Sequence, residues 1–231
     1  MILIKPSYEI MSPVPDNTYT SLAPELIIEK AGRVCYKSEA HISPISSDRF
    51  IKKIIKNGHE SVLEHSSMTV KFIIDRGVSH ELVRHRLASF SQESTRYCNY
   101  KGGVTFVIPP WVEAAPGEYP EYPEEDELLG PFNDPGDATD VWLLAMKSAE
   151  DNYLELVNKY GWSPQQARSV LPNSLKTELI MTANFREWRH VFKLRAASAA
   201  HPQMQEIMFP LLRECVGRWP AVFGDLEWNE D

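Results

Sequence analysis

The chain has few cysteines, no long hydrophobic run and no excess of positive charge. Its three cysteines, Cys35, Cys98 and Cys215, lie far apart and form no C-x-x-C pair, which argues against a disulfide framework or a cysteine zinc site. No apolar run approaches the roughly 20 residues that a membrane helix needs, and no signal peptide is visible at the N-terminus. We therefore expect a cytoplasmic protein that does not bind membranes.

The formal net charge is −8, which argues against a polymer-binding protein that coats nucleic acid, because such proteins are usually basic. The charge is unevenly distributed, since no Lys or Arg occurs between Lys101 and Lys147. The segment just before this stretch is rich in arginine, with Arg76, Arg84, Arg86 and Arg96. A locally basic site on an acidic protein is typical of a site for a small anion, such as a nucleotide phosphate.

Hydrophobic periodicity predicts helices and strands mixed in one domain, 1–231. Helices are predicted over about 24–35, 48–57, 140–160, 164–171 and 184–195. A further helix is predicted from residue 80 through Arg84. The last predicted helix begins at residue 202, and Pro210 is expected to kink it. Strands are predicted at 68–75 and 104–108, whereas 175–183 fits either a strand or a helix. Ser79, Thr139 and Asn184 are the expected N-caps. Residues about 111–140, rich in Pro, Gly, Glu and Asp, are predicted to form an exposed acidic insertion without a core.

The segment from Arg84 to Tyr97 combines three arginines with a row of small hydrogen-bonding side chains. If it begins as a helix, Arg84 and Arg86 point to different sides of it. Guanidinium forks and hydroxyls suit phosphate binding. Only Glu81 and Glu93 lie nearby to neutralise the arginines, which indicates that a ligand supplies negative charge. A solvated arginine face or internal ion pairs would fit these residues equally well.

Arg84-His85-Arg86, followed after seven residues by Ser94, resembles the signature of flavin-dependent thymidylate synthases. Further family segments are matched at 31–35, 58–65, 167–172, 182–186 and 194–195, so that the resemblance covers roughly 25–110 and 140–215. It implies an α+β fold, a single mixed α/β domain with an antiparallel sheet packed by helices. It also implies an enzyme that converts dUMP to dTMP with FAD, methylenetetrahydrofolate and NADPH, acting as a homotetramer with active sites at subunit interfaces.

Carried over by position, the resemblance implies two ligand sites. The implied FAD set is His59, Ser61, Arg84, His85, Arg86, Gln92, Asn184, Arg186 and His190. The implied dUMP set is Glu81, Arg84, Gln92, Ser94, Thr95, Arg96, Arg168 and Arg195. Within it, Arg96 and Arg168 would bind the phosphate. The catalytic residue would be Arg195, whose guanidinium against the uracil ring would favour loss of the N3 proton and make C5 more nucleophilic. No covalent protein nucleophile is implied.

The chain departs from the family pattern at Gln92, where Glu is frequent, at Ser91, where Asn is frequent, and in the long run 196–203. An amide cannot act as a base, so Gln92 is expected only to bind. No metal is expected, because the histidines lack a one-face zinc spacing. Two alternatives stay open: a single-stranded nucleic-acid platform around Tyr97 and Tyr100, and a non-catalytic nucleotide-binding protein. Steep loss of affinity with salt would identify the first.

Overall fold

The computed structural model describes residues 1–13, 23–119 and 137–226. They form two compact units, each assembled from three chain segments. The first unit contains the described residues of Met1–Ser7, Ile73–Leu82 and Gln92–Leu179, and the second those of Tyr8–Phe72, Val83–Ser91 and Ile180–Asp231. That the whole chain acts as one domain stays a prediction. No helix in the described ranges is long and apolar enough to cross a bilayer.

Two nine-residue strands, β3 (Ser67–Asp75) and β7 (Lys176–Asn184), are central in a four-stranded sheet of order β2-β3-β7-β4. The outer strands are β2 (Ser7–Ser12) and β4 (Ala88–Gln92). Side chains of β3 and β7 alternate between buried and partly exposed, the period-two pattern of strands with one buried face. The two are antiparallel, because Phe185 N donates to Ser66 O at one end and Arg76 N donates to Leu175 O at the other. Residues 176–184 are therefore strand.

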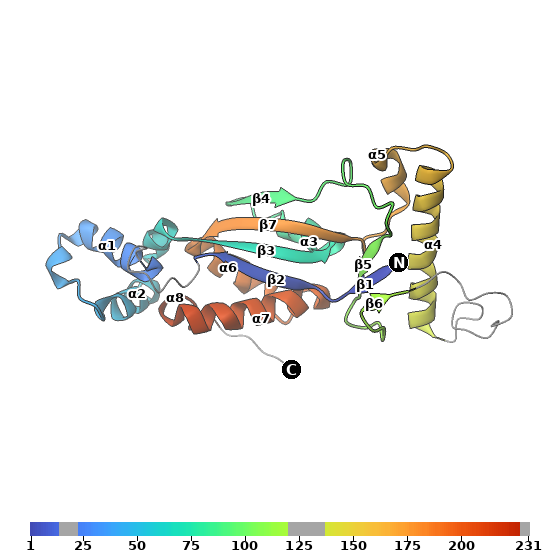
Figure 1. The fold of residues 1–231 in the computed structure, drawn as a ribbon. Coiled ribbons are helices and arrows are strands. Elements are labelled where there is room, and N and C mark those ends of the chain that lie inside the picture. The colour runs from blue at the N-terminus through green and yellow to red at the C-terminus, as the bar shows by residue number, and fades with distance from the viewer. Residues whose placement is uncertain (14–22, 120–136, 227–231) are drawn as a thin grey trace. The chain divides into compact units, whose positions relative to one another are not determined.

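The first unit contains a second sheet, in which β1 (Ile2–Ile4) lies between β5 (Thr105–Val107) and β6 (Gly117–Glu118). β1 runs parallel to β5 and antiparallel to β6. The long helix α4 (Ala138–Asn158) runs beside these strands in Figure 1, and the short helices α5 (Pro164–Ala167) and η4 (Arg168–Val170) pack against it. Leu3, Phe106 and Tyr153 join these elements in one hydrophobic core.

The expectation that 111–140 lacks a core is wrong for its first residues. Val112 is buried in the core of the first unit, and β6 pairs with β1. Residues 120–136 lie outside the described residues. The cap of α4 is Asp137 rather than the predicted Thr139, because the Asp137 carboxylate accepts from the backbone N–H groups of Thr139 and Asp140 at 2.7 and 3.1 Å. A carboxylate here satisfies two donors that begin the helix.

The second unit contains most of the helices. α1 (Pro24–Tyr36) packs on α2 (Ser46–Lys56), and α2 packs on α8 (Pro220–Phe223), as can be followed in Figure 1. α1 also packs on the 3-10 helix η2 (Glu60–His65). A further 3-10 helix, η1 (Glu39–His41), joins α1 to α2. α6 (Phe185–Arg195) contacts η2 and α7 (Pro202–Arg218), which continues through Pro210. Aromatic contacts among Trp188, Phe192 and Phe223 hold α6 against α8.

The helix predicted to run from residue 80 through Arg84 is shorter and begins earlier. α3 spans Arg76–Leu82, so Ser79 lies inside the helix rather than capping it. Asp75 caps the first turn, because its Oδ1 accepts from Val78 N at 2.8 Å. A Cβ on Gly77 would lie 2.9 Å from that oxygen, so glycine suits this cap. Residues 83–87 therefore form a turn that leads into β4.

Arg189 is a buried cation of α6 that the C-terminal turn neutralises. Its guanidinium donates to the Asp225 carboxylate at 2.5 and 2.7 Å and also to Val222 O, and these bonds lower the pKa of Asp225. We expect Asp225→Asn to reduce the free energy of unfolding in urea by about 1–3 kcal/mol, because a buried cation loses its nearest charged partner and keeps only Glu60 among the described residues, at 3.7 Å. Asp48→Asn, which breaks an exposed 3.1 Å pair with Lys52, should cost less than about 0.5 kcal/mol. Equal losses of stability in the two variants would contradict the assignment of Asp225 as the partner that neutralises Arg189.

Candidate functional site

A cavity of about 370 Å³ in the second unit lies where the turn 83–87 meets α6. We call it the arginine cavity. Its lining residues are Arg84, His85, Arg86, Leu87, Glu187, His190, Leu194 and Arg195. The turn places Arg84 and Arg86 at the same cavity, so the expectation that they point to different sides of a helix is wrong. Residues predicted from both ligand sets thus lie together here.

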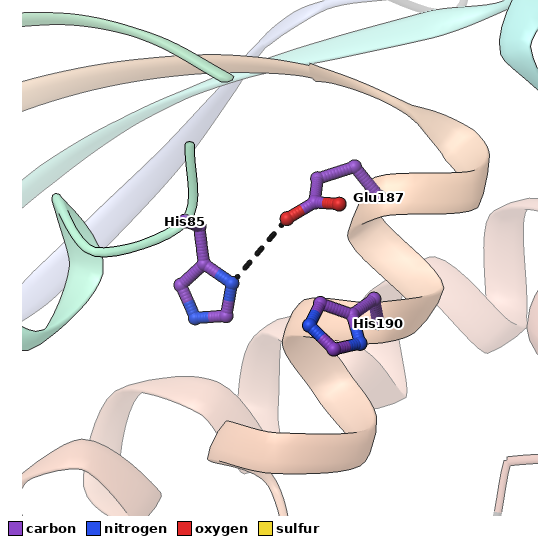
Figure 2. Close-up of side chains that lie close together, drawn as sticks. All are labelled: His85, Glu187 and His190. Atoms are coloured by element: carbon purple, nitrogen blue, oxygen red, sulfur yellow. Dashed lines mark ion pairs between the residues drawn. The ribbon is translucent and has the colours of Figure 1, made fainter. Parts of the chain in front are cut away.

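His85 is the buried centre of the arginine cavity, with 5% of its surface exposed. Figure 2 shows its ring between the turn and α6, with Nδ1 3.4 Å from Glu187 Oε1. On the opposite side of the ring, Nε2 accepts a hydrogen bond from Arg195 Nε at 3.2 Å. Because Nε2 accepts, the proton of a neutral ring lies on Nδ1, which faces the Glu187 carboxylate.

The charge of His85 follows from its surroundings. Burial, together with the nearby Arg195 and His190, lowers the pKa of His85 from 6.5 to about 4. The ring is therefore neutral near pH 7, and its contact with Glu187 joins a neutral imidazole to a carboxylate rather than two full charges. Glu187, His85 and Arg195 thus form a chain in which each member orients the next.

Asn184 and Glu187 show how α6 begins. Asn184 Oδ1 accepts from Glu187 N at 2.8 Å, which confirms the predicted N-cap. The reciprocal half of a capping box is not formed by Glu187, whose carboxylate approaches His85 instead. Glu187 was not among the site residues predicted from the sequence, so its contact with His85 was missed. Helical periodicity could have indicated that Glu187 belongs to the site, since residues 187, 190 and 194 share one face of α6.

A second cavity of the second unit, of about 400 Å³, lies among α1, α2 and η2. We call it the η2 cavity. Three residues of the predicted flavin set, His59, Ser61 and Arg186, line it together. Arg186 donates to Glu64 Oε1 at 2.6 Å, and both side chains are about half exposed. Cys35 also lines this cavity and was not among the predicted residues.

The first unit contains most of the predicted dUMP residues. Arg168 donates to Thr95 Oγ1 at 3.1 Å, which brings together two predicted residues that are 73 positions apart. Ser94 Oγ accepts from Arg96 N at 3.3 Å, and the Arg96 guanidinium lies 5.4 Å from the Tyr97 ring centroid. The same short segment therefore carries the hydroxyls and the guanidinium predicted to bind phosphate.

Gln92 and Glu93 begin this segment. The Gln92 amide donates to Ser79 Oγ at 2.9 Å and to Thr177 Oγ1 at 3.2 Å, contacts that position the side chain between α3 and β7. Glu93 accepts from Lys176 Nζ and from the Tyr100 hydroxyl, each at 3.0 Å. The Glu93 carboxylate is thus neutralised by Lys176. Glu81, the other acid near the arginines in sequence, lies in α3 of the same unit.

The chain matches known proteins over most of its length. A family model described as thymidylate synthase complementing protein matches residues 18–221. The chain is 35% identical over 225 residues to the flavin-dependent thymidylate synthase of Mycobacterium marinum, a match that covers 95% of this chain and 86% of that one. It is also 35% identical over 210 residues to the flavin-dependent thymidylate synthase of Geobacter sulfurreducens, with 87% and 82% covered.

The chain belongs to the flavin-dependent thymidylate synthase family. Its fold is similar to a crystal structure of the UMP/dUMP methylase PolB from Streptomyces cacaoi bound with 5-Br dUMP, with a TM-score of 0.70 and 26% identity. That match covers 97% of this chain and 96% of the other. The predicted resemblance and the predicted fold class, helices packed on antiparallel sheet, are confirmed.

Within this member of the family, His85, Glu187 and His190 bring one ligand atom each within 4.8 Å of one another (Figure 2), a spacing that could hold a metal ion. The surrounding charge opposes that use. Arg84, Arg86 and Arg195 line the same cavity, and His85 Nε2 is already hydrogen bonded to Arg195. Positive charges repel a divalent cation and attract an anion. The charge around the cavity therefore favours an anion over a divalent cation, and the absence of a metal stays a prediction.

The buried His85 ring gives a pH prediction. We expect its NMR titration to show a pKa near 4 rather than near 6.5. Because the folded pKa lies below the unfolded one, the neutral ring contributes stability above about pH 6.5, and this contribution disappears as the pH falls through about 4. The melting temperature of wild type relative to His85→Gln should therefore decline over that range. A titration midpoint near 6.5 would contradict the burial and charge argument.

Proposed function

We propose that this chain is a flavin-dependent methyltransferase that converts dUMP to dTMP, with FAD as redox cofactor, methylenetetrahydrofolate as one-carbon donor and NADPH as reductant. The observation that carries the proposal is the arginine cavity, where three guanidinium groups surround a neutral buried histidine on a chain of net charge −8. An anionic, planar ligand fits this arrangement. The names of the relatives, flavin-dependent thymidylate synthase and UMP/dUMP methylase, support the same reaction.

The residues present fit a flavin. His85, Arg86 and His190 would contact it from the arginine cavity, and His59, Ser61 and Arg186 from the η2 cavity. Guanidinium groups bind pyrophosphate and stabilise negative charge on a reduced flavin ring. When bound, the flavin would supply the redox chemistry of the reaction. The further flavin contacts predicted for Arg84, Gln92 and Asn184 are part of the same proposal.

The chain's own residues would bind and activate the uracil. Arg195 would lie against the ring, where its charge favours loss of the N3 proton and raises electron density at C5. Because His85 is neutral, its hydrogen bond orients Arg195 without cancelling that charge. A thiolate is not part of the proposal. Burial raises the pKa of the Cys215 thiol, and Cys98 is the only cysteine near the predicted nucleotide residues.

The phosphate of dUMP would be bound by Arg96 and Arg168, with Ser94 and Thr95 as hydrogen-bond partners. Arg168 is already held by Thr95 Oγ1, so little side-chain freedom would be lost on binding. Glu81, Gln92 and Arg84 complete the proposed substrate set. The homotetramer with active sites at subunit interfaces, and a location in the cytoplasm, belong to the proposal on the family resemblance alone.

An absorption spectrum of the purified protein, repeated during a dUMP titration, tests the proposed function. We expect a flavin spectrum that dUMP perturbs in a saturable manner, followed by dTMP formation when NADPH and methylenetetrahydrofolate are added. A protein that binds dUMP but shows no flavin spectrum even after FAD is added would reduce the function to nucleotide binding. Affinity for single-stranded nucleic acid that falls steeply with salt would point to the nucleic-acid alternative.

Glu187 should act through Arg195. We expect Glu187→Gln to lower kcat for dTMP formation about tenfold, because the side chain that faces His85 Nδ1 loses its charge and Arg195 loses part of its orientation. The flavin content and the melting temperature should change little. Glu155→Gln, which breaks an exposed 2.7 Å pair with Lys159, is the matched control and should leave kcat unchanged. A normal kcat in Glu187→Gln would refute the positioning role.

A further inference from the structure

A third cavity of the second unit, of about 790 Å³, is larger than the two already described. We call it the α2 cavity, because α2 forms one wall, while the end of α1 and residues 38–46 form the rest. Its charged lining residues are Arg33, Arg49 and Lys53, and the side chains of His41 and His59 also line it. No acidic residue of the described chain lines it. On a protein of net charge −8, such a one-signed lining favours an anionic ligand.

Two of these cations stand four residues apart on α2. Arg49 and Lys53 therefore lie on the same face of the helix, and like charges at this spacing destabilise a helix. Neither forms an ion pair with any described residue. The neighbouring Lys52, by contrast, pairs with Asp48 at 3.1 Å in the usual stabilising arrangement. The Arg49–Lys53 pair thus has no visible use in stabilising the helix.

The third cation, Arg33, is fixed in place. Its Nε and Nη2 donate to Glu29 Oε1 at 3.1 and 2.8 Å, and its guanidinium lies 4.7 Å from the Phe50 ring centroid. Glu29 is fully buried, and its second oxygen accepts from Ser46 Oγ at 2.8 Å. A charge held in this way loses little freedom when a ligand binds.

Apolar and aromatic side chains complete the α2 cavity. Tyr36 is 65% exposed and Ile45 is 86% exposed, and both line it beside Phe50. Exposed apolar surface next to cations suits a ligand that joins a planar ring to anionic groups. Tyr36, Phe50 and His59 also line the η2 cavity, so a molecule in the α2 cavity would reach the proposed flavin residues.

We propose that the α2 cavity binds the anionic end of a co-substrate that reacts at the flavin, through Arg33, Arg49 and Lys53. This inference rests on the proposed function. Both co-substrates of that function carry the required chemistry, since NADPH joins phosphates to an adenine ring and methylenetetrahydrofolate joins carboxylates to aromatic rings. The reactive end of the molecule would extend toward the η2 cavity.

The test uses the full chain with its flavin and the double variant Arg49→Gln/Lys53→Gln. Equilibrium dialysis would measure Kd for NADP⁺ and, separately, for tetrahydrofolate, neither of which turns over alone. We expect at least tenfold weaker binding of one or both ligands, with a smaller difference at high salt. Weaker NADP⁺ binding assigns the cavity to the phosphate-bearing co-substrate, and weaker tetrahydrofolate binding assigns it to the carboxylate-bearing one.

Lys56→Gln is the matched control, because Lys56 is an exposed residue of the same helix and does not line the α2 cavity. Both Kd values should be unchanged in this variant. The inference is overturned if the double variant binds both ligands within twofold of wild type, if Lys56→Gln causes the same loss, or if wild type binds neither ligand. A flavin spectrum that responds to dUMP would leave the proposed function standing in the first two cases. Wild type that binds neither ligand would also contradict the two proposed co-substrates, so the failure of the inference alone is distinguishable from the failure of the proposed function.

Discussion

Arg195→Ala should lower kcat for dTMP formation by about 10²–10³-fold while the protein keeps its flavin. A loss of kcat of this size is expected when a charged group that stabilises developing negative charge is removed from an active site. The Arg195 side chain extends from the last turn of α6 to His85, where its Nε donates to Nε2 at 3.2 Å. Loss of this side chain should leave the surrounding fold intact, because His85 keeps its contact with Glu187.

Two further variants make the Arg195 test specific. Arg195→Lys keeps the charge but lacks the Nε that bonds His85, so we expect kcat between those of wild type and Arg195→Ala. Lys193→Ala, an exposed change in the same helix, should leave kcat unchanged. Flavin absorbance per protomer and kcat would be measured for each. Near-normal turnover in Arg195→Ala would remove this residue from the catalytic proposal.

Local sequence signals predicted much of the fold. The period-two pattern of β3 and the Asn184 cap of α6 depend on neighbouring residues, and both were predicted correctly. The turn at 83–87 was not predicted. Asp75, at the end of the preceding strand, caps α3, so this helix begins and ends earlier in the sequence than expected. The core position of Val112 was also missed, since it depends on contacts with distant parts of the chain.

In the candidate site, too, local features could be predicted from the sequence and contacts between distant residues could not. The spacing of Arg84, His85 and Arg86 with Ser94, together with the further matching segments, identified the family, because motifs are local patterns. The contact between His85 and Glu187 could not be predicted, since the two residues lie 102 positions apart in the sequence. Burial of His85, which sets its charge, likewise follows only from the folded chain.

Arg86→Ala should weaken flavin binding by about tenfold to a hundredfold, the loss expected when a charged hydrogen-bond donor to an anionic ligand is removed. Arg86 is exposed in the turn 83–87 and lines the arginine cavity, so its removal should not disturb the fold. Flavin retained per protomer after gel filtration, and Kd for added FAD, would be measured. Unchanged values would remove Arg86 from the flavin set.

Arg96→Ala is the variant to compare with Arg86→Ala. Arg96 is also an exposed arginine, but it lies in the first unit next to Ser94 in the proposed phosphate set. We expect it to keep its flavin and to bind dUMP more weakly, the opposite of the Arg86→Ala pattern. If both variants lost flavin and dUMP binding equally, the two arginines would not serve separate ligands. Opposite losses would assign one guanidinium to the flavin and the other to the nucleotide phosphate.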